Sequence, residues 1–438
     1  MRLSQAAIAN LPASIARPSY ERAQAVGIVH FGIGAFHRAH QAWYTDRALG
    51  AGAQGWMIAG VSLRSADVAA QLNPQDGLYT LTERSGAEGD SCVIGAVREV
   101  LLAGRDDAAI LARLANPDCR IVSFTVTEKG YCRAPDGTLD REAAGASFYP
   151  LLAEGLRQRM HAGQPGLTLL SCDNLAGNGG QLAVLMRGWL TMEAPEVLAW
   201  FEAECTCPAT MVDRIVPATT EAYRIALAGR LGATDEGAVF TERFSQWVIE
   251  DRFAGPRPPW EHFGAQLVGD VAPYEAAKLR MLNGAHSALA YLGLAKGYRY
   301  VHEAIADPEL RALVEDLMRH EAAPTIAPAP GQDLAAYADA LVRRFADPAL
   351  NHRLAQIAMD GSQKIPQRWL ATLASREACG EDAPAIRRAL GAWFEHLRRG
   401  SDVNDPRADE LRAILARAPR GRELDAIFGA GWRAVATV

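Results

Sequence analysis

Residues 27–49, GIVHFGIGAFHRAHQAWYTDRAL, contain the pattern that decides the fold. The segment begins with the apolar run Gly27-Ile-Val-His-Phe31 and passes through Gly32-Ile-Gly34. It continues into AFHRAHQAWYTDRAL, which has the spacing of a helix. This order predicts a strand, a tight turn and a helix.

The same alternation continues along the first half of the chain. Apolar runs of strand length occur at Trp56–Leu63, Ile121–Val126 and Leu167–Ser171, and stretches compatible with helices occur at Asp107–Leu114 and Leu151–Met160. Strands that alternate with helices favour a parallel sheet covered by helices on both faces. The sequence therefore predicts an α/β fold with a Rossmann-type amino-terminal domain.

After about residue 270 the pattern changes, because strand signals nearly vanish and apolar residues recur with helical spacing. Helices are expected at Tyr274–Leu294, Pro308–His320, Leu334–Phe345, Ala385–Leu397 and Ala408–Ala416. A length of 438 residues also exceeds one ordinary hydrophobic core. We therefore expect a Rossmann-type domain over residues 1–268 and a mostly helical substrate domain over residues 269–438, with the Pro- and Gly-rich piece 253–259 as a connector.

Composition points to a small-molecule partner. The chain has 49% hydrophobic residues and a net charge of -6, with no long run of either sign. Nucleic acid is not an expected partner, and the absence of about 18 uninterrupted apolar residues argues against a membrane span. The first residues lack the apolar stretch of a secretion signal, so a cytoplasmic location is expected. The oligomeric state is left open.

No metal site is expected from the cysteines. There are seven, they are scattered, and they form no CxxC pair. None has a histidine partner at the spacing of metal ligands. Cys205 and Cys207 are interpreted as ordinary thiols.

A dinucleotide site is suggested by Gly32 and Gly34 at the end of the first strand. Glycine there lets the backbone approach a pyrophosphate, and the following helix offers its free amides. The third glycine of GxGxxG is replaced by His37, so a purely structural glycine turn is an equal alternative. After the second strand, Asp67 is the candidate partner of an NAD ribose, although Arg64 is placed to meet the extra phosphate of NADP and a surface acid is the plain alternative.

The catalytic candidates lie on an otherwise apolar helix. At about 100° per residue, Asn283 lies about 140° and His286 about 80° around the axis from Lys278, so the three polar groups share one side. Oxidation or reduction at a secondary alcohol needs a proton-transfer group and donors for the oxygen. Lys278, partly desolvated, would have its pKa lowered toward neutrality and suit that role. An exposed lysine with Asn283 and His286 bonded locally is the alternative.

At this point several long motifs in the same order resemble the mannitol dehydrogenase family of polyol-specific dehydrogenases over nearly the whole chain. They are FGIGAFHRAHQ (31–41), TVTEKGYC (125–132), SCDN (171–174), TMVDRIVP (210–217) and KLRMLNGAHSALAYLG (278–293). The resemblance implies a metal-independent, NAD-linked oxidoreductase. In it, Lys278 is the general acid/base, and Asn283 and His286 hold the reacting oxygen.

The resemblance also implies roles for other residues. Glu275 is implied to be a proton-path neighbour of the lysine. The expected cofactor-binding set is Gly32, Gly34, Phe36, Asp67, Thr127 and Glu128. On the substrate side, the family pattern implies Asn174, Asp213 and Lys364, to which we add Arg353 as a candidate cation. Capping or bracing of a loop is the alternative role for each of the implied substrate and proton-path residues.

Within the family, MVDRIVPATT, QWVIED and QIAMDGSQKIPQR resemble the D-fructuronate reductases more than the polyol-oxidising members. Those members tend to carry Arg where this chain has Gln356, whereas the uronate reductases have Gln there and Arg at the position of Arg353. The expected reaction is therefore reduction of D-fructuronate to D-mannonate. A mannitol or arabinitol dehydrogenase is the nearest alternative, and a catalytically silent NAD-binding sensor of sugar acids is an alternative of another class.

Overall fold

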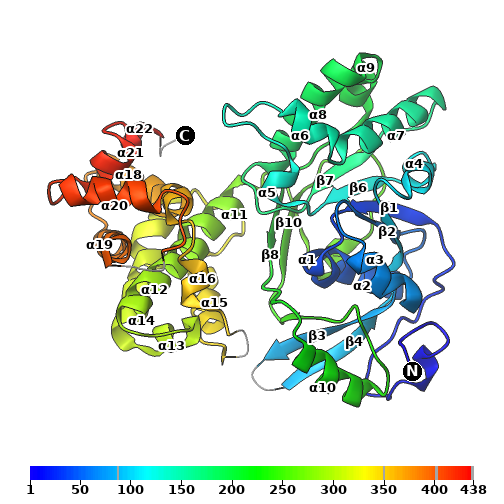
Figure 1. Ribbon diagram of the computed structural model, residues 1–438, viewed down its shortest axis with the longest axis horizontal. Coiled ribbons are helices and arrows are strands. Elements are labelled where there is room, and N and C mark those ends of the chain that lie inside the picture. The colour runs from blue at the N-terminus through cyan, green and yellow to red at the C-terminus, as the bar shows by residue number, and fades with distance from the viewer. Residues whose placement is uncertain (86–87, 349–350, 400–402, 436–438) are drawn as a thin grey trace. The chain divides into compact units, whose positions relative to one another are not determined.

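The structure, a computed structural model, describes residues 1–85, 88–348, 351–399 and 403–435. The chain divides into two compact units, Met1–Val271 and Ala272–Val438 (Figure 1).

The first unit is organised around a five-stranded parallel sheet. Its strand order is β5-β2-β1-β6-β7. The bounds are β1 Val26–Phe31, β2 Met57–Ser62, β5 Val97–Leu102, β6 Ile121–Phe124 and β7 Thr168–Ser171. In the register, Phe31 stands beside Val61 and Phe124, so these three strands end together. The predicted α/β fold is confirmed.

The central strand β1 is apolar because both of its faces are covered. Ile28 packs into one core cluster, whereas its neighbours Val29 and Phe31 pack into another on the opposite face. The first cluster includes residues of α2 (Gln41–Gly50) and α3 (Asp67–Leu72), and the short helix α1 (Ala35–Ala39) precedes them. The second includes residues of α4 (Asp107–Leu114), α7 (Tyr149–His161), α8 (Asn178–Glu193) and α9 (Pro195–Glu204). A strand buried on both faces needs a continuous apolar run.

Two smaller sheets complete the first unit, and the sequence pattern did not predict them. One has the order β11-β10-β8, with bounds Gln266–Val268, Gln246–Glu250 and Thr210–Asp213. The other has the order β4-β3-β9, with bounds Glu88–Ile94, Tyr79–Ser85 and Val239–Glu242. The remaining helices of this unit are α5 (Thr127–Gly130), α6 (Arg141–Gly145) and α10 (Glu221–Leu231).

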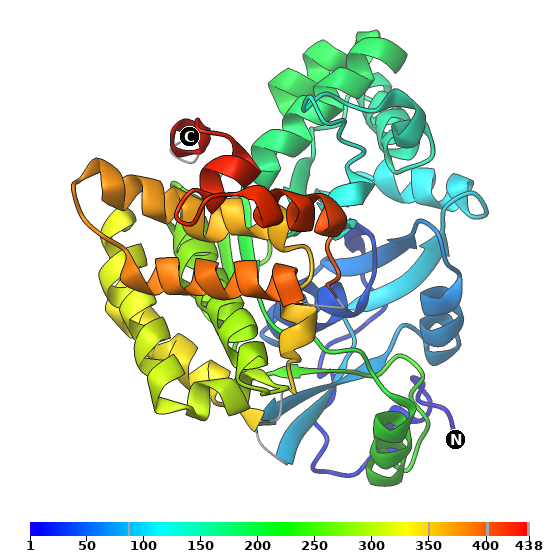
Figure 2. The same ribbon diagram turned by 60° about the vertical axis from the view of Figure 1, so that its left-hand side comes forward.

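The second unit is helical, as its yellow-green to red ribbons in Figure 2 show. Its longer elements are α12 (Gly284–Ala295), α14 (Pro308–Asp316), α15 (Leu334–Phe345), α19 (Pro384–Arg399) and α20 (Ala408–Arg417). Shorter helices are α11 (Ala272–Ala277), α13 (Val301–Ala306), α16 (Leu354–Ile357), α17 (Gly361–Ile365), α18 (Ala371–Ala378), α21 (Glu423–Phe428) and α22 (Trp432–Val435). Among the described residues of this unit, π-helical segments interrupt them at η4 (Lys278–Asn283), η5 (Leu317–Ala322) and η8 (Pro366–Leu370).

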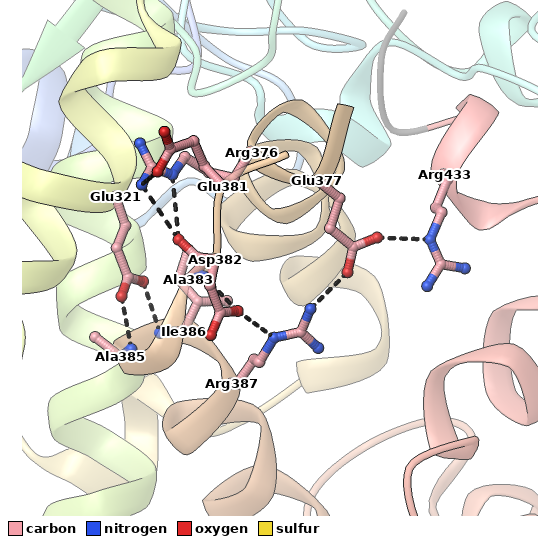
Figure 3. A network of polar contacts seen from close by, with 10 residues as sticks. All are labelled: Glu321, Arg376, Glu377, Glu381, Asp382, Ala383, Ala385, Ile386, Arg387 and Arg433. Carbon is pink, nitrogen blue, oxygen red and sulfur yellow. Dashed lines mark hydrogen bonds and ion pairs between the residues drawn. The ribbon is translucent and has the colours of Figure 1, made fainter. Parts of the chain in front are cut away.

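Helix α12 forms the centre of this unit. It packs against α13, α14, α16 and α19, and nearly every residue of its first two turns is buried. Around it, a polar network fixes the start of α19 (Figure 3). The buried carboxylate of Glu321 accepts hydrogen bonds from the backbone amides of Ala385 (2.6 Å) and Ile386 (2.9 Å), which have no partner inside the helix. The helix that carries the candidate catalytic residues is thus held by its surroundings.

Candidate functional site

The glycine turn after β1 is built as the sequence predicts. Gly32 has a φ of 91°, and a Cβ atom there would lie 2.2 Å from the carbonyl oxygen of Thr125, so no other residue fits. A Cβ on Gly34 would meet only the Gly32 oxygen, at 3.8 Å. Gly34 also begins α1 without a side-chain cap. Open space and uncapped amides at this turn suit an approaching phosphate.

The third position of the glycine motif is filled by a packed histidine. The His37 ring is fully buried and stacks on the His30 ring with a centroid distance of 3.5 Å. Neither His37 nitrogen has a hydrogen-bond partner among the described residues. Burial lowers the pKa of His37 well below its usual range and that of His30 to about 3, so both rings are neutral at pH 7. The neighbouring Phe36 is half-buried and stacks on His40 at 5.0 Å.

The candidate ribose partner lies on an exposed turn after β2. Asp67 is the first residue of α3, and its backbone amide donates to the Ser65 hydroxyl at 3.0 Å. Arg64 is exposed on the same turn. The structure thus places both the acid and its competing cation at the carboxyl end of the second strand.

Asp173 joins the ends of β6 and β7 and was not predicted. Its Oδ2 accepts from the amide of Val126 and its Oδ1 from the amide of Thr127, both at 2.9 Å. The Tyr131 hydroxyl donates to Oδ2 at 2.9 Å. Burial raises the pKa of Asp173, and the three hydrogen bonds oppose that rise. The carboxylate holds the exposed turn that begins with Thr127 and Glu128. Its position inside SCDN was the only signal for it.

Asn178 makes the next connection, from β7 to β8. Its fully buried side chain accepts from the Thr210 amide and donates to the Thr210 carbonyl, both at 2.9 Å. It also donates to the carbonyl of Asp173 at 3.1 Å. The exposed Asn174 follows that carbonyl, and the buried Asp213 ends the strand that Thr210 begins. The Asn178 side chain therefore links the two segments that carry the candidate substrate residues of this unit.

Lys278, Asn283 and His286 lie on one continuous helical stretch, but its geometry is not that of an ideal α-helix. Residues Lys278–Asn283 form the π-helix η4 between α11 and α12. In a π-helix, residue i bonds to residue i+5, so Asn283 comes one turn above Lys278. The angle of about 140° predicted from α-helical spacing is therefore wrong, and the two groups lie closer around the axis. Lys278 is only 9% exposed, Asn283 is half-buried, and so is Glu275 one turn earlier.

His286 is neutral at pH 7 because of its surroundings. It is only 8% exposed, and its ring packs against Phe345 (4.6 Å between centroids) and His352 (5.3 Å). Burial, with the nearby charges of His352, Arg344 and Arg368, lowers the pKa of His286 well below its usual range. A neutral imidazole keeps one donor nitrogen and one acceptor nitrogen.

The two predicted cations differ in burial. Arg353 is exposed at the start of α16. Lys364 on α17 is half-buried, donates to the Met359 carbonyl at 2.6 Å, and lies 3.9 Å from a carboxylate oxygen of Asp360. Burial, then the charge of Arg368, lowers the pKa of Lys364. Only Lys364 is therefore held in a fixed, partly desolvated position.

Within the described ranges, no group of three or more His, Cys, Asp or Glu side chains is arranged to hold a metal ion. The seven cysteines are free thiols. Among the described residues no helix combines the length and hydropathy needed to cross a membrane.

Comparisons with known proteins agree with this architecture. The mannitol dehydrogenase Rossmann-domain family model matches residues 26–262, and the mannitol dehydrogenase C-terminal-domain model matches residues 270–426. The uncharacterized oxidoreductase YeiQ of Escherichia coli K12 is 41% identical, over 95% of this chain and 90% of its own. The D-mannonate oxidoreductase of the same organism is 40% identical, over 96% of this chain and 91% of its own.

A solved structure gives the same result. The Pseudomonas fluorescens mannitol 2-dehydrogenase, in a ternary complex with NAD and D-mannitol, superposes with a TM-score of 0.84 and 35% identity. The match covers 100% of this chain and 95% of that one.

Proposed function

This chain belongs to the mannitol dehydrogenase family of oxidoreductases, and we propose that within this family it reduces D-fructuronate to D-mannonate with NADH. The observation that carries the proposal is the placement of Lys278, Asn283 and His286 on a buried helix in a chain that is 40% identical to a D-mannonate oxidoreductase. We assign residues 1–268 to nucleotide binding, together with the substrate candidates Asn174 and Asp213, and residues 269–438 to catalysis and the remaining substrate contacts.

The residues around the first glycine turn fit NAD. Space is open at Gly34, and α1 begins there without a side-chain cap. The proposed binding set is Gly32, Gly34, Phe36, Asp67, Thr127 and Glu128. When bound, the reduced nicotinamide supplies a hydride, and the chain's own residues supply the proton and the hydrogen bonds to the reacting oxygen. Asp67 bonds the ribose hydroxyls, and Asp173 supports the site by fixing the turn at Thr127.

The proton step belongs to the second unit. When the carbonyl carbon accepts the hydride, the electron pair of the C=O π bond would move to the oxygen, and the ammonium of Lys278 would give that oxygen its proton. The side chains of Asn283 and His286 donate hydrogen bonds to that oxygen while its charge develops. The neutral Lys278 then regains a proton along a path that begins at Glu275. An amine performs this transfer without a metal ion.

The remaining candidates bind the sugar acid. Asn174 and Asp213 recognise hydroxyl groups, because an amide and a carboxylate are a donor–acceptor pair for them. Arg353 and Lys364 are the sequence-predicted cations for the carboxylate, since charge-assisted bonds contribute more than neutral ones. Of these two, Lys364 is half-buried and Arg353 is exposed.

A polyol dehydrogenase is the second candidate function. The observation in its favour is the TM-score of 0.84 to the mannitol 2-dehydrogenase complex, because the same residues would act on an uncharged polyol. A silent NAD-binding sensor is disfavoured, since a sensor has no need for a proton-transfer group such as Lys278.

The experiment is a substrate panel with fructuronate, tagaturonate, fructose and xylulose, followed by NADH absorbance. We expect the highest kcat/KM with fructuronate. Equal or better efficiency with fructose assigns the chain to the polyol dehydrogenases, and a flat baseline with every substrate supports the sensor.

A further inference from the structure

Arg368 lies next to the candidate catalytic turn. It belongs to η8, which packs against η4. The Trp369 indole nitrogen donates to the Gly284 carbonyl at 3.0 Å. A Cβ atom on Gly284 would lie 3.3 Å from the Arg368 carbonyl oxygen, so the two backbones nearly touch there. The π-helical turn of Arg368 is thus packed on the one that carries Lys278 and Asn283.

The guanidinium of Arg368 has few partners for its degree of burial. It is half-buried, and its Nη1 donates to the Ser287 hydroxyl at 2.7 Å. That is its single hydrogen bond among the described residues, and no described carboxylate pairs with it. Burial lowers the pKa of Arg368 to about 10. By contrast, the buried Arg22 donates to three backbone carbonyls and to Gln5. A guanidinium has five N–H donors, so Arg368 keeps several for a ligand.

The other cations nearby are less suited to bind an anion. Lys364, four residues earlier, already donates to the Met359 carbonyl and faces Asp360. Arg353 is exposed. The charge of Arg368 contributes to the lowered pKa values of both His286 and Lys364.

We propose that Arg368 binds the carboxylate of the sugar acid and sets the preference for a uronate over a neutral ketose. The inference rests on the proposed function. The planar guanidinium matches a carboxylate with two parallel hydrogen bonds, which a neutral sugar cannot replace. Ser287 acts as a positioning residue, since its hydroxyl accepts from Nη1 and fixes the orientation of the fork.

The test compares kcat/KM for fructuronate and fructose in the full-length Arg368→Gln enzyme. We expect the ratio of the two values to fall at least about tenfold, mainly through a higher KM for fructuronate, because a charged hydrogen bond is lost in both ground and transition states. Added guanidinium chloride should restore part of the fructuronate activity. Arg368→Lys keeps the charge but loses the planar guanidinium with its paired N–H donors. It should give an intermediate ratio of the two kcat/KM values.

Two matched variants distinguish carboxylate binding by Arg368 from a purely structural role of Arg368. Arg343→Gln removes an exposed arginine of the same unit and should leave the ratio unchanged. Ser287→Ala removes only the hydroxyl partner of Arg368 and should change the ratio less than Arg368→Gln does. If Ser287→Ala reproduces the full effect, or if Arg368→Gln lowers both substrates equally, Arg368 is a structural brace and the inference is wrong.

The failure of this inference is distinguishable from that of the proposed function. A wild-type enzyme with equal or better efficiency on fructose contradicts the substrate and this role of Arg368 together. A wild-type preference for fructuronate that survives Arg368→Gln contradicts the role of Arg368 alone.

Discussion

His30, His37 and His286 are neutral at pH 7 because they are buried. For His286 we relate this neutrality to the proposed reaction, and for the other two to packing. His286 keeps a donor nitrogen for the proposed ketone oxygen without adding a charge beside Arg368. His30 and His37 pack as a stacked pair beneath the glycine turn. His30 also bonds the hydroxyls of Ser123 and Thr125, both at 2.8 Å. A protonated ring in either place would carry an uncompensated buried charge.

This predicts a dependence of stability on pH. Burial lowers the pKa of His30 to about 3, whereas an unfolded histidine titrates near 6.5. Between these values only the unfolded chain binds the proton, so stability is lost as the pH falls below 6.5. One such histidine accounts for a loss on the order of 2 kcal/mol between pH 6.5 and 5.

Chemical denaturation at pH 7 and pH 5 checks this prediction. His30→Gln should show a smaller loss between the two pH values than the wild type. The exposed His320→Gln is the control and should behave as the wild type does. An unchanged pH dependence in His30→Gln would contradict the neutral state of the buried ring.

Asp67 determines the expected cofactor preference. Its carboxylate would bond the ribose hydroxyls of NAD and repel the 2′-phosphate of NADP. Asp67→Ala should therefore reduce the preference for NADH over NADPH by about tenfold. Steady-state kinetics with both cofactors measures this, with Arg64→Ala as the companion variant because that side chain would attract the phosphate. Equal efficiency with both cofactors in the wild type, or no change in Asp67→Ala, would disprove the role.

At the residue scale, the sequence predicts those residues that break a local pattern. Lys278 and His286 are polar positions on an apolar helix, so they were visible without a structure. Asp173 and Arg368 follow no such rule, because their roles come from groups far away in the sequence. Asp173 bonds an amide 46 residues away, and Arg368 bonds a hydroxyl 81 residues away.

At the scale of elements, the π-helical turns are the main feature that the sequence did not predict. Apolar spacing identified helices over the regions that contain η4 and η5, but it does not distinguish i+4 from i+5 hydrogen bonding. Segment η8 packs against this turn and comes close to Gly284, a tertiary contact that apolar spacing does not report. As a result, the helix was predicted correctly while the angle between Lys278 and Asn283 was not.

The connection between β6 and β7 gives a prediction at the same scale. Asp173→Asn places an amide group against the backbone N–H of Val126 or Thr127, which leaves one partly buried donor without an acceptor. Such a loss costs about 1–3 kcal/mol. We expect a lower melting temperature and weaker binding of NADH, measured by calorimetry.

The matched control is Asp140→Asn in the same unit. Asp140 is an exposed cap that accepts from the Ala143 amide at 3.0 Å. Its replacement should leave the NADH affinity unchanged. If Asp173→Asn binds NADH as tightly as the wild type does, the Asp173 carboxylate has no part in shaping the nucleotide site.

For the whole molecule, the change in apolar period near residue 270 was enough to predict two architectures. Long strands with both faces buried, such as β1, were recognised because their apolar runs are continuous. Strands β10 and β11 of one smaller sheet were missed, because three to five residues with mixed burial give little periodicity. The candidate residues divide in the same way, because the nucleotide-binding candidates lie in the first unit and the candidate proton-transfer group lies in the second.

That division is the central claim, and Lys278→Ala tests it most directly. The change removes the proton carrier and leaves every candidate nucleotide-binding residue in place. Turnover at neutral pH should fall by about 100-fold or more, while the dissociation constant of NADH, measured by fluorescence titration, should stay within about twofold of the wild type. A variant that keeps a tenth of the wild-type turnover, or that loses NADH binding along with activity, would contradict the assignment of proton transfer to Lys278.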